Sequence, residues 1–342
     1  MNPIMMSVII SSLALGTVIT MSSTHWLMAW IGLELNTLAI IPIIAKHHHP
    51  RATEATTKYF LIQAAASATV LFSSTINAWS TGTWDIMQLT NPCACTMLTM
   101  ALSMKLGLAP LHFWLPEVLQ GSSLKTALII TTWQKLAPMT LLYLTHHSLN
   151  TTTLLTMGLM STMIGGWGGL NQTQVRKIMA YSSIAHLGWM ATILTLSPNL
   201  MLLNLALYLM MTLSTFMLLI FSSSKTIKDL TTSWTLSPPT TALMLLLLMS
   251  MAGLPPLTGF MPKWLILQDL TSHNLPTTAT IMALSALLSL FFYLRLTYTT
   301  TLTMSPTTTQ NKLKWRLQPK LKTTILSMAA MLSTTLLPIT PT

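Results

Sequence analysis

Long apolar stretches recur from one end of the chain to the other, separated by short polar connections. A helix needs about 20 apolar residues to cross a hydrocarbon core about 30 Å thick. The pattern therefore predicts an all-α polytopic membrane protein with about eleven transmembrane spans. The predicted spans are 3–21, 24–45, 59–79, 93–120, 124–145, 150–170, 174–196, 198–222, 238–272, 276–300 and 323–340.

The basic residues in the connections between spans, or at their edges, support the assignment, because short loops on the inner side of a membrane accumulate Lys and Arg. Loops after odd-numbered spans hold none of them, so the N-terminus is expected on the basic face and the C-terminus opposite. Arg295, near the end of the tenth span, is expected to extend its side chain to the same face. The loops after even-numbered spans hold Lys46, Arg51, Lys58, Lys125, Arg176, Lys177, Lys225, Lys228, Lys312, Lys314, Arg316, Lys320 and Lys322.

The fourth and ninth spans are too long for one straight crossing, and each has a centre rich in Gly and Pro. Residues 107–119 align without gaps to residues 253–265 in the shared frame G-L-x-P-L-x-x-x-x-P. We interpret both spans as broken helices. The residues expected to form the breaks are Gly107, Pro110, Gly253, Pro255 and Pro256.

The two breaks lie five helices apart, and an odd offset inverts the second unit relative to the first. Inverted repeats with broken helices are typical of transporters, whose ion sites lie between the repeats. We expect a single domain over 1–342, with repeats at 1–145 and 150–300 and a loop and last helix at 301–342. Two independent Pro kinks are the alternative, since membrane helices tolerate Pro.

Four charged residues lie inside predicted spans, away from the ends. Each costs about 2.5 to 3.5 kcal/mol to place at the membrane centre, so such residues usually face a polar cavity or one another. Lysine suits proton transfer there, because burial disfavours its charged form and a nearby carboxylate favours it. The expected proton-relay residues are Glu34, Lys105, Lys135 and Lys263.

Other titratable residues accompany these four. His112 and His186 could pass a proton as neutral imidazoles or could simply be hydrogen-bonded. Glu117 and Asp269, in the second halves of the broken spans, could form the mouths of half-channels or cap helices. Snorkelling and structural pairing of the charges are the alternative to a relay.

The composition excludes several other classes. Only 7% of the residues are charged, against roughly 25% in soluble domains. The net charge of +11 is scattered between apolar segments, so no nucleic-acid-binding face is expected. The N-terminus resembles neither a signal peptide nor a transit peptide.

No metal, nucleotide or redox site is expected in this chain. The spacing of Cys93 and Cys95 fits neither a zinc site nor a redox pair. The histidines at 47–49 lie in a basic loop without acidic or Cys partners. The glycine-rich stretch 165–169 lacks a dinucleotide-binding pattern and is expected to permit close helix packing.

The stretch from Gly168 to Trp189, GGLNQTQVRKIMAYSSIAHLGW, resembles the NADH dehydrogenase subunit 2 family, antiporter-like subunits of mitochondrial respiratory complex I. The segments around Lys105 and Lys263 are also similar, and the resemblance covers the whole chain. It implies a core membrane-arm subunit of the proton-translocating NADH:ubiquinone reductase, shortened at its N-terminus relative to bacterial members. By motif position, the relay axis would be Glu34, Lys105, Lys135 and Lys263.

The resemblance also implies where the cofactors and partners lie. NAD, FMN, iron-sulfur clusters and ubiquinone would belong to other subunits of the complex. The partners would be other membrane-arm subunits, including further antiporter-like and supernumerary subunits, and lipids, with cardiolipin a candidate. The location would be the mitochondrial inner membrane, with the N-terminus and the basic face in the matrix and the C-terminus in the intermembrane space. A free-standing cation/proton antiporter and a purely structural membrane subunit are the alternatives.

Overall fold

The computed structural model describes residues 3–47, 49–302, 327, 330–331 and 334. The predicted span 323–340 and most of the loop before it lie outside the described residues. The chain divides into two compact units, Met1–Ser161 with Met190–Pro198, and Thr162–Trp189 with Asn199–Thr342. Every regular element in the described part is a helix, as the apolar pattern predicts.

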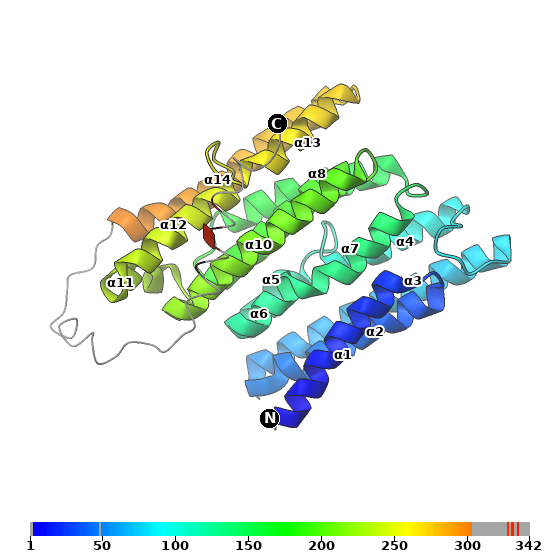
Figure 1. Ribbon diagram of the computed structural model, residues 1–342, viewed down its shortest axis with the longest axis horizontal. Helices are drawn as coiled ribbons and strands as arrows, with labels where there is room; N and C mark the ends of the chain where they lie inside the picture. The colour runs from blue at the N-terminus through cyan, green and yellow to red at the C-terminus, as the bar shows by residue number, and fades with distance from the viewer. Residues whose placement is uncertain (1–2, 48, 303–326, 328–329, 332–333, 335–342) are drawn as a thin grey trace. The chain divides into compact units, whose positions relative to one another are not determined.

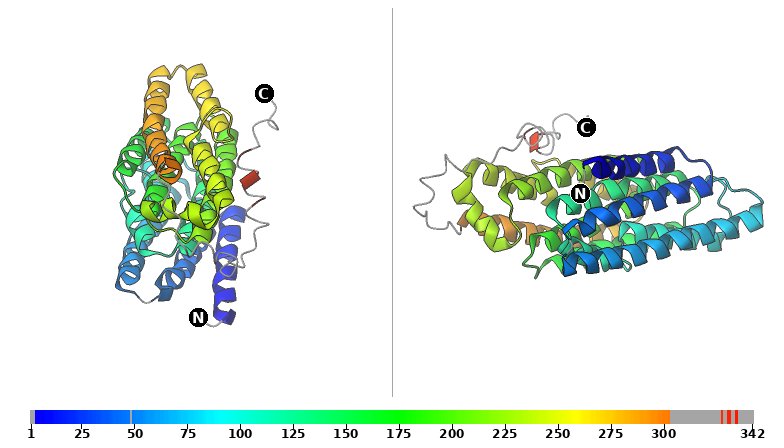
Figure 2. Two further views of the ribbon diagram at one scale, coloured as in Figure 1. Left: turned by 90° about the vertical axis from the view of Figure 1, so that its left-hand side faces the viewer. Right: turned by 90° about the horizontal axis from the view of Figure 1, so that it is seen from below.

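In the first unit, α1, α2 and α3 lie side by side (Figures 1 and 2). Helix α3 also packs against α4 and α5, and α7 packs against α1, α2, α4 and α6. The helices are α1 Pro3–Ser22, α2 Trp26–Ile44, the 3-10 turn η1 Ala45–His47, α3 Pro50–Thr81, α4 Pro92–Leu106, α5 Trp114–Gly121, α6 Leu124–Thr131 and α7 Trp133–Thr145.

In the second unit, α14 packs against α11, α12 and α13. The helices α8 Thr151–Gly169 and α9 Val175–Ile193 each have residues in both units. The remaining helices are α10 Pro198–Ser222, α11 Ile227–Leu236, α12 Pro238–Ala252, α13 Phe260–Ser272 and α14 Pro276–Leu302.

Hydroxyl side chains are satisfied within the helices themselves. The Thr20 hydroxyl donates to the carbonyl of Thr17 at 2.8 Å, and the Ser73 hydroxyl to that of Val70 at 2.7 Å. Such bonds remove the cost of placing a hydroxyl in an apolar medium. They explain how a chain so rich in Thr forms membrane helices.

Two segments of seven residues interrupt the helices at matching places, 107–113 between α4 and α5 and 253–259 between α12 and α13. In both, a glycine with positive φ ends the first helix, Gly107 at 79° and Gly253 at 85°. A left-handed glycine is a common helix end because it has no Cβ to clash. The gapless alignment of 107–119 with 253–265 therefore has a structural counterpart in the helix ends.

Loops at one end of a unit pair with each other. In the first unit, Trp26 N–H donates to the Trp84 carbonyl at 3.1 Å and Ile86 N–H to the Thr24 carbonyl at 3.0 Å. These bonds join the loops after the first and third predicted spans. In the second unit, Val175 N–H donates to the Lys225 carbonyl at 3.1 Å, joining the loops after the sixth and eighth.

Arg295 lies at the second of these loop pairs. Its guanidinium donates to the carbonyls of Leu170 and Gln172, in the loop that precedes Arg176 and Lys177. The side chain therefore reaches the loop after the sixth predicted span, which is one of the basic loops.

The glycine-rich stretch packs closely, as expected. A Cβ on Gly165 would lie 2.7 Å from the Ala185 nitrogen, and one on Gly168 would lie 2.3 Å from the Tyr181 ring. Side chains at these two positions would force α8 away from α9.

Several predicted boundaries were wrong. The span predicted at 124–145 is two helices, because the backbone departs from helical geometry at Thr132, with φ −109° and ψ −71°. The hydroxyls of Thr131 and Thr132 donate back to the carbonyls of Ala127 and Leu128 at 2.9 and 2.6 Å. This back-bonding bends helices. Lys135 therefore lies in the first turn of α7 and not in the middle of a long helix.

Helix α3 begins at Pro50 and not at Tyr59, so Arg51 and Lys58 lie on helix where a loop was predicted. The His49 ring nitrogen accepts from the Arg51 N–H at 3.2 Å and caps this early start, with Pro50 as the first helical residue. Helix α11 was not predicted. Within the described residues, α1, α2, α3, α10 and α14 are long and apolar enough to cross a membrane, and α4 and α12 are apolar but shorter.

Candidate functional site

The C-terminal end of α4 is closed by donors from three other helices. A helix leaves its last four carbonyls without partners inside the helix, and here each of them accepts a hydrogen bond. Ser103 O accepts from the Gly107 N–H at 2.8 Å, Met104 O from the Trp114 indole N–H at 3.0 Å, Lys105 O from the Gln63 amide at 3.5 Å, and Leu106 O from the Lys135 ammonium.

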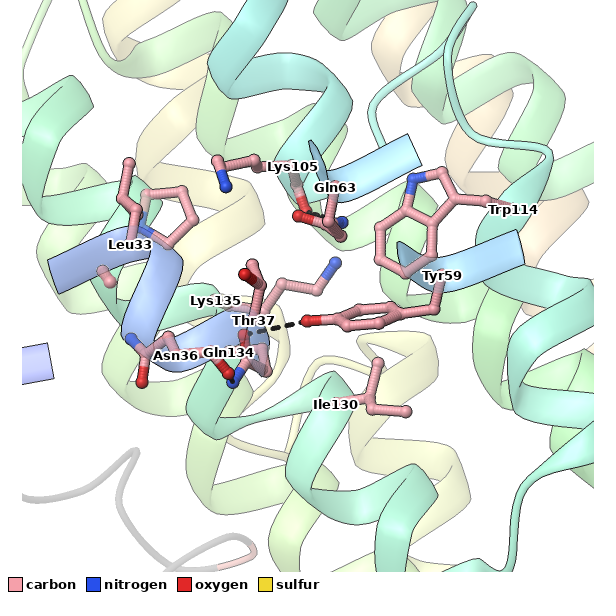
Figure 3. Close-up of a pocket in the computed structure, with 12 residues that line it drawn as sticks. Leu33, Asn36, Thr37, Tyr59, Gln63, Lys105, Trp114, Ile130, Gln134 and Lys135 are labelled. Atoms are coloured by element: carbon pink, nitrogen blue, oxygen red, sulfur yellow. Dashed lines mark hydrogen bonds between the residues drawn. The ribbon is translucent and has the colours of Figure 1, made fainter. Parts of the chain in front are cut away.

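The side chains of Lys105 and Lys135 line one cavity beside this helix end (Figure 3). The space between the lining groups is large enough for about one water molecule. Tyr59, Gln63 and Trp114 also face it. The other lining residues are Leu33, Asn36, Thr37, Ile130, Gln134, Ala137 and Pro138.

The two lysines differ in their contacts. Lys135 is 1% exposed, its ammonium donates to the Leu106 carbonyl, and it lies 5.9 Å from the centre of the Trp114 ring. A cation at a helix C-terminus and over an aromatic face is stabilised by both. Lys105 is 5% exposed, and its ammonium has no hydrogen-bond partner among the described residues.

Glu34 lies on α2 between Leu33 and Asn36, two residues that line the cavity. One of its carboxylate oxygens is buried without a hydrogen-bond partner in the described part of the chain. When ionised, this carboxylate interacts electrostatically with Lys105 and Tyr59. The structure thus brings Lys105 and Lys135 to one cavity and places a carboxylate within electrostatic range of Lys105.

A short polar network crosses the same cavity. The Tyr59 hydroxyl donates to the Gln134 amide oxygen at 3.4 Å, and the Gln134 amide nitrogen donates to the Asn36 carbonyl at 3.5 Å. The Tyr59 and Trp114 rings form a T-shaped pair, with centres 5.8 Å apart. Helices α2, α3, α5 and α7 each contribute a side chain or carbonyl to this arrangement.

Lys263 lines a smaller cavity in the second unit, together with His186, Trp189 and Tyr293. Its ammonium donates to the carbonyl of Ala252, the last residue of α12, at 2.7 Å. The His186 ring lies 5.5 Å from the Tyr208 ring, centre to centre. The structure therefore brings the expected residues Lys263 and His186 together.

Two weaker candidates lie elsewhere. His112 is buried in the first break, where its ring centre lies 4.3 Å from that of Phe113, and it lines neither cavity. Glu117 is exposed on α5 and pairs with Lys58 at 2.7 Å, and Lys58 also pairs with Glu54 at 2.5 Å. Within the described residues, no three His, Cys, Asp or Glu side chains are placed to hold a metal ion.

The sequence interpretation missed the uncharged members of the first cavity, chiefly Tyr59, Gln63 and Trp114. A usable signal was present, because Tyr59 and Gln63 are four residues apart and lie on one face of a helix. An amide inside an apolar span also requires polar partners, as a buried charge does.

Comparison with known proteins identifies the family of this chain. Residues 23–289 match the family described as NADH:quinone oxidoreductase/Mrp antiporter, transmembrane, and residues 290–342 match NADH dehydrogenase subunit 2, C-terminus. NADH-ubiquinone oxidoreductase chain 2 of Xenopus laevis is 62% identical, over 100% of this chain and 99% of the relative. The Latimeria chalumnae protein of the same name is 59% identical, over 100% and 98%.

Solved structures share the fold. A chain of respiratory complex I from Thermus thermophilus matches with a TM-score of 0.84 and 24% identity, over 97% of this chain and 77% of that one. A chain of the Mrp complex from Dietzia matches with a TM-score of 0.80 and 16% identity, over 88% and 61%.

Proposed function

Because the chain belongs to the NADH dehydrogenase subunit 2 family, we propose that it relays protons within the membrane arm of respiratory complex I along Glu34, Lys105, Lys135 and Lys263. It is an antiporter-like subunit of NADH:ubiquinone oxidoreductase. The redox cofactors NAD, FMN, iron-sulfur clusters and ubiquinone are assigned to other subunits in this proposal. The chain's own contribution is proton movement.

The observation that carries the relay is the shared cavity of Lys105 and Lys135. Two lysines that line a space for about one water molecule can exchange a proton inside the protein, without contact with bulk solvent. Both protonation states are accessible to a buried lysine, because burial opposes the charge and nearby carboxylate or carbonyl groups support it. Glu34, whose charge acts on Lys105, would set the balance between these states.

Lys263 and His186 would continue the relay in the second unit. They share a cavity there, and a neutral imidazole can accept and donate a proton. His112 remains a weaker relay candidate, since it is buried but lines neither cavity.

The proposal includes eleven transmembrane spans, with inverted repeats at 1–145 and 150–300 and a matrix loop and last span at 301–342. The matching breaks at 107–113 and 253–259 support the repeat. The paired loops support alternating crossings, because loops after odd spans meet each other in the first unit and loops after even spans meet in the second. The basic loops would face the matrix of the mitochondrial inner membrane, and the C-terminus the intermembrane space.

The partners would be other membrane-arm subunits, including further antiporter-like and supernumerary subunits, and lipids, with cardiolipin a candidate. A free-standing cation/proton antiporter is the rival reading. Relatives named as a chain of the oxidoreductase match over the full length of this chain, which favours the subunit. Reconstitution of the purified chain in sealed vesicles separates the two, because unaided cation/proton exchange would contradict the subunit reading.

One observation favours a second, structural role for two of the lysines. Lys135 and Lys263 each cap a helix end, so either could be retained to hold helices together. Lys105 caps nothing in the described part of the chain, and its ammonium is buried there without a partner. A purely structural role therefore does not explain the charge of Lys105.

Lys105→Met in the assembled complex is accordingly the test of the relay. Methionine keeps the volume and removes the titratable group, so we expect normal assembly and fewer protons translocated per electron. Lys125→Met, on an exposed lysine at the start of α6, is the matched control and should leave the ratio unchanged. A normal ratio in Lys105→Met would exclude an essential relay through this lysine.

A further inference from the structure

The first cavity lacks a direct connection between its two lysines. Among the described residues, no hydrogen bond joins the ammonium groups of Lys105 and Lys135. Lys135 is engaged with the Leu106 carbonyl, which accepts hydrogen bonds but cannot carry a proton onward. Proton exchange between the lysines therefore requires a group that both accepts and donates.

Few of the side chains that line the cavity meet that requirement. The amides of Gln63, Gln134 and Asn36 donate and accept hydrogen bonds but do not exchange protons as acids or bases. Two lining residues have hydroxyls, Tyr59 and Thr37. The Thr37 hydroxyl donates to the Glu34 carbonyl within α2 at 2.8 Å, so it is committed to its own helix.

Tyr59 differs from Thr37 in its freedom to exchange a proton. Its hydroxyl makes one long hydrogen bond, 3.4 Å to the Gln134 amide oxygen. No described group donates to the phenol oxygen, so its lone pairs can accept. The side chain is 1% exposed, and its hydroxyl lies across the cavity from its own helix (Figure 3).

Trp114 positions both the phenol and Lys135. The centre of its ring lies 5.8 Å from the centre of the Tyr59 ring, in a T-shaped pair, and 5.9 Å from the Lys135 ammonium. Its own orientation is fixed by the 3.0 Å hydrogen bond to the Met104 carbonyl. The Tyr59 phenol and the Lys135 ammonium thus both lie next to the Trp114 indole, and Figure 3 shows both pointing into the cavity.

We propose that Tyr59 is a further proton-relay residue, which passes protons between Lys135 and Lys105 through its hydroxyl. This inference rests on the proposed relay function and adds a residue to it.

The step conserves atoms and charge. The Lys135 ammonium gives a proton, directly or through one water molecule, to the phenol oxygen and becomes a neutral amine. The original phenol O–H bond breaks as the new one forms, and the released proton passes through water to the neutral amine of Lys105. Tyr59 ends as a neutral phenol, and the same step can run in reverse.

The test is Tyr59→Phe in the assembled complex, measured as the rate of proton translocation in sealed vesicles in H₂O and in D₂O. Phenylalanine keeps the ring against Trp114 and removes only the hydroxyl with its one long hydrogen bond. We expect the rate per assembled complex to fall by about tenfold or more and the H₂O/D₂O ratio to rise. Tyr143→Phe is the matched control, because Tyr143 lies on α7 outside the cavity and should tolerate the change.

An unchanged rate and isotope ratio in Tyr59→Phe would overturn the inference. If Tyr59→Phe lowers assembly, Tyr59→His tests the inference instead. An imidazole can pass a proton, so the His variant should translocate protons faster than the Phe variant, per assembled complex. Equal rates for His and Phe would contradict a relay. Loss of translocation in Lys105→Met with a normal Tyr59→Phe would overturn only the role of Tyr59, whereas a normal Lys105→Met would overturn the proposed function itself.

Discussion

The Lys263 ammonium donates a 2.7 Å hydrogen bond to the carbonyl of Ala252, the last residue of α12. Lys135 makes the same kind of bond to Leu106, the last residue of α4. Leu106 and Ala252 directly precede Gly107 and Gly253, the first residues of the two aligned segments. Each broken segment thus offers a helix-end carbonyl to a lysine, buried in the case of Lys135 and part-buried in the case of Lys263. The two lysines come from elements that do not correspond in sequence.

Gly253→Ala should disturb Lys263 directly. The residue has φ +85°, and a Cβ would lie 3.0 Å from both Cδ and Nζ of Lys263. We expect a loss of about 1–2 kcal/mol from left-handed strain and, in addition, fewer protons translocated per electron because the ammonium is displaced. Thermal unfolding and proton-to-electron ratios of the assembled complex measure the two effects.

The control for that substitution is Gly82→Ala. Gly82 has a similar φ of +73°, but a Cβ there would have no atom within 4 Å. It should show the strain without any effect on proton translocation. Equal proton-to-electron ratios in both variants would contradict a functional link between Gly253 and Lys263.

Trp114→Phe should weaken the end of α4. It leaves the Met104 carbonyl, a part-buried acceptor, without its indole donor, which costs about 1 kcal/mol. Thermal stability of the assembled complex is the measurement. Trp79→Phe, at a side chain that is 92% exposed, should change stability little, and an equal loss in both variants would contradict the capping role.

Lys58→Met should have little effect. Lys58 pairs with Glu54 and Glu117, but all three side chains are substantially exposed, and exposed ion pairs contribute about 0–1 kcal/mol. We expect a normal proton-to-electron ratio and a small stability loss that disappears at high salt. A lower ratio would instead place the Lys58–Glu117 pair at the mouth of a proton path.

Asp229 should make the start of α11 sensitive to acid. Hydrogen bonds from the Thr226 and Lys225 N–H groups hold the pKa of Asp229 below its ordinary value. Because the pKa of Asp229 is lower in the folded state than in the unfolded state, its ionised carboxylate stabilises the helix fully at pH values above the unfolded pKa of about 4. This stabilisation is lost as the pH falls through the folded-state pKa. Hydrogen exchange of α11 amides, corrected for intrinsic rates, should therefore show less protection below that range.

Asp229→Asn provides the comparison for this pH effect. The amide cannot titrate, so protection of α11 should be weaker at neutral pH and nearly independent of pH. Unchanged pH dependence in this variant would assign the effect to another group.

Features with a strong local cause were predictable from the sequence. Glycine and proline in a repeated frame located both breaks, because they limit backbone geometry wherever they occur. Lys105 and Lys135 were recognisable because a charge inside an apolar span is costly. The alternation of basic loops across the membrane stays a prediction from the positions of Lys and Arg.

Features set by tertiary packing were not predictable. No strong helix breaker marks Thr132, whose departure from helical geometry accompanies hydroxyl bonds to the preceding turn. The spacing of Tyr59 and Gln63 showed only that they share a helix face, since the contacts of Tyr59 with Trp114 and Gln134 come from helices distant in sequence. The capping of Leu106 by Lys135 likewise requires α4 and α7 to pack together.

The central claim is that the buried charges act as one relay, and a double substitution tests it most directly. Protons translocated per electron should be measured for Lys105→Met, Lys135→Met and the double variant in the same preparation. If both lysines serve one path, each single change lowers the ratio and the double variant equals the lower of the two, since groups acting as a unit are not additive. A normal ratio in either single variant, or a double loss equal to the sum of the two, would contradict a single relay.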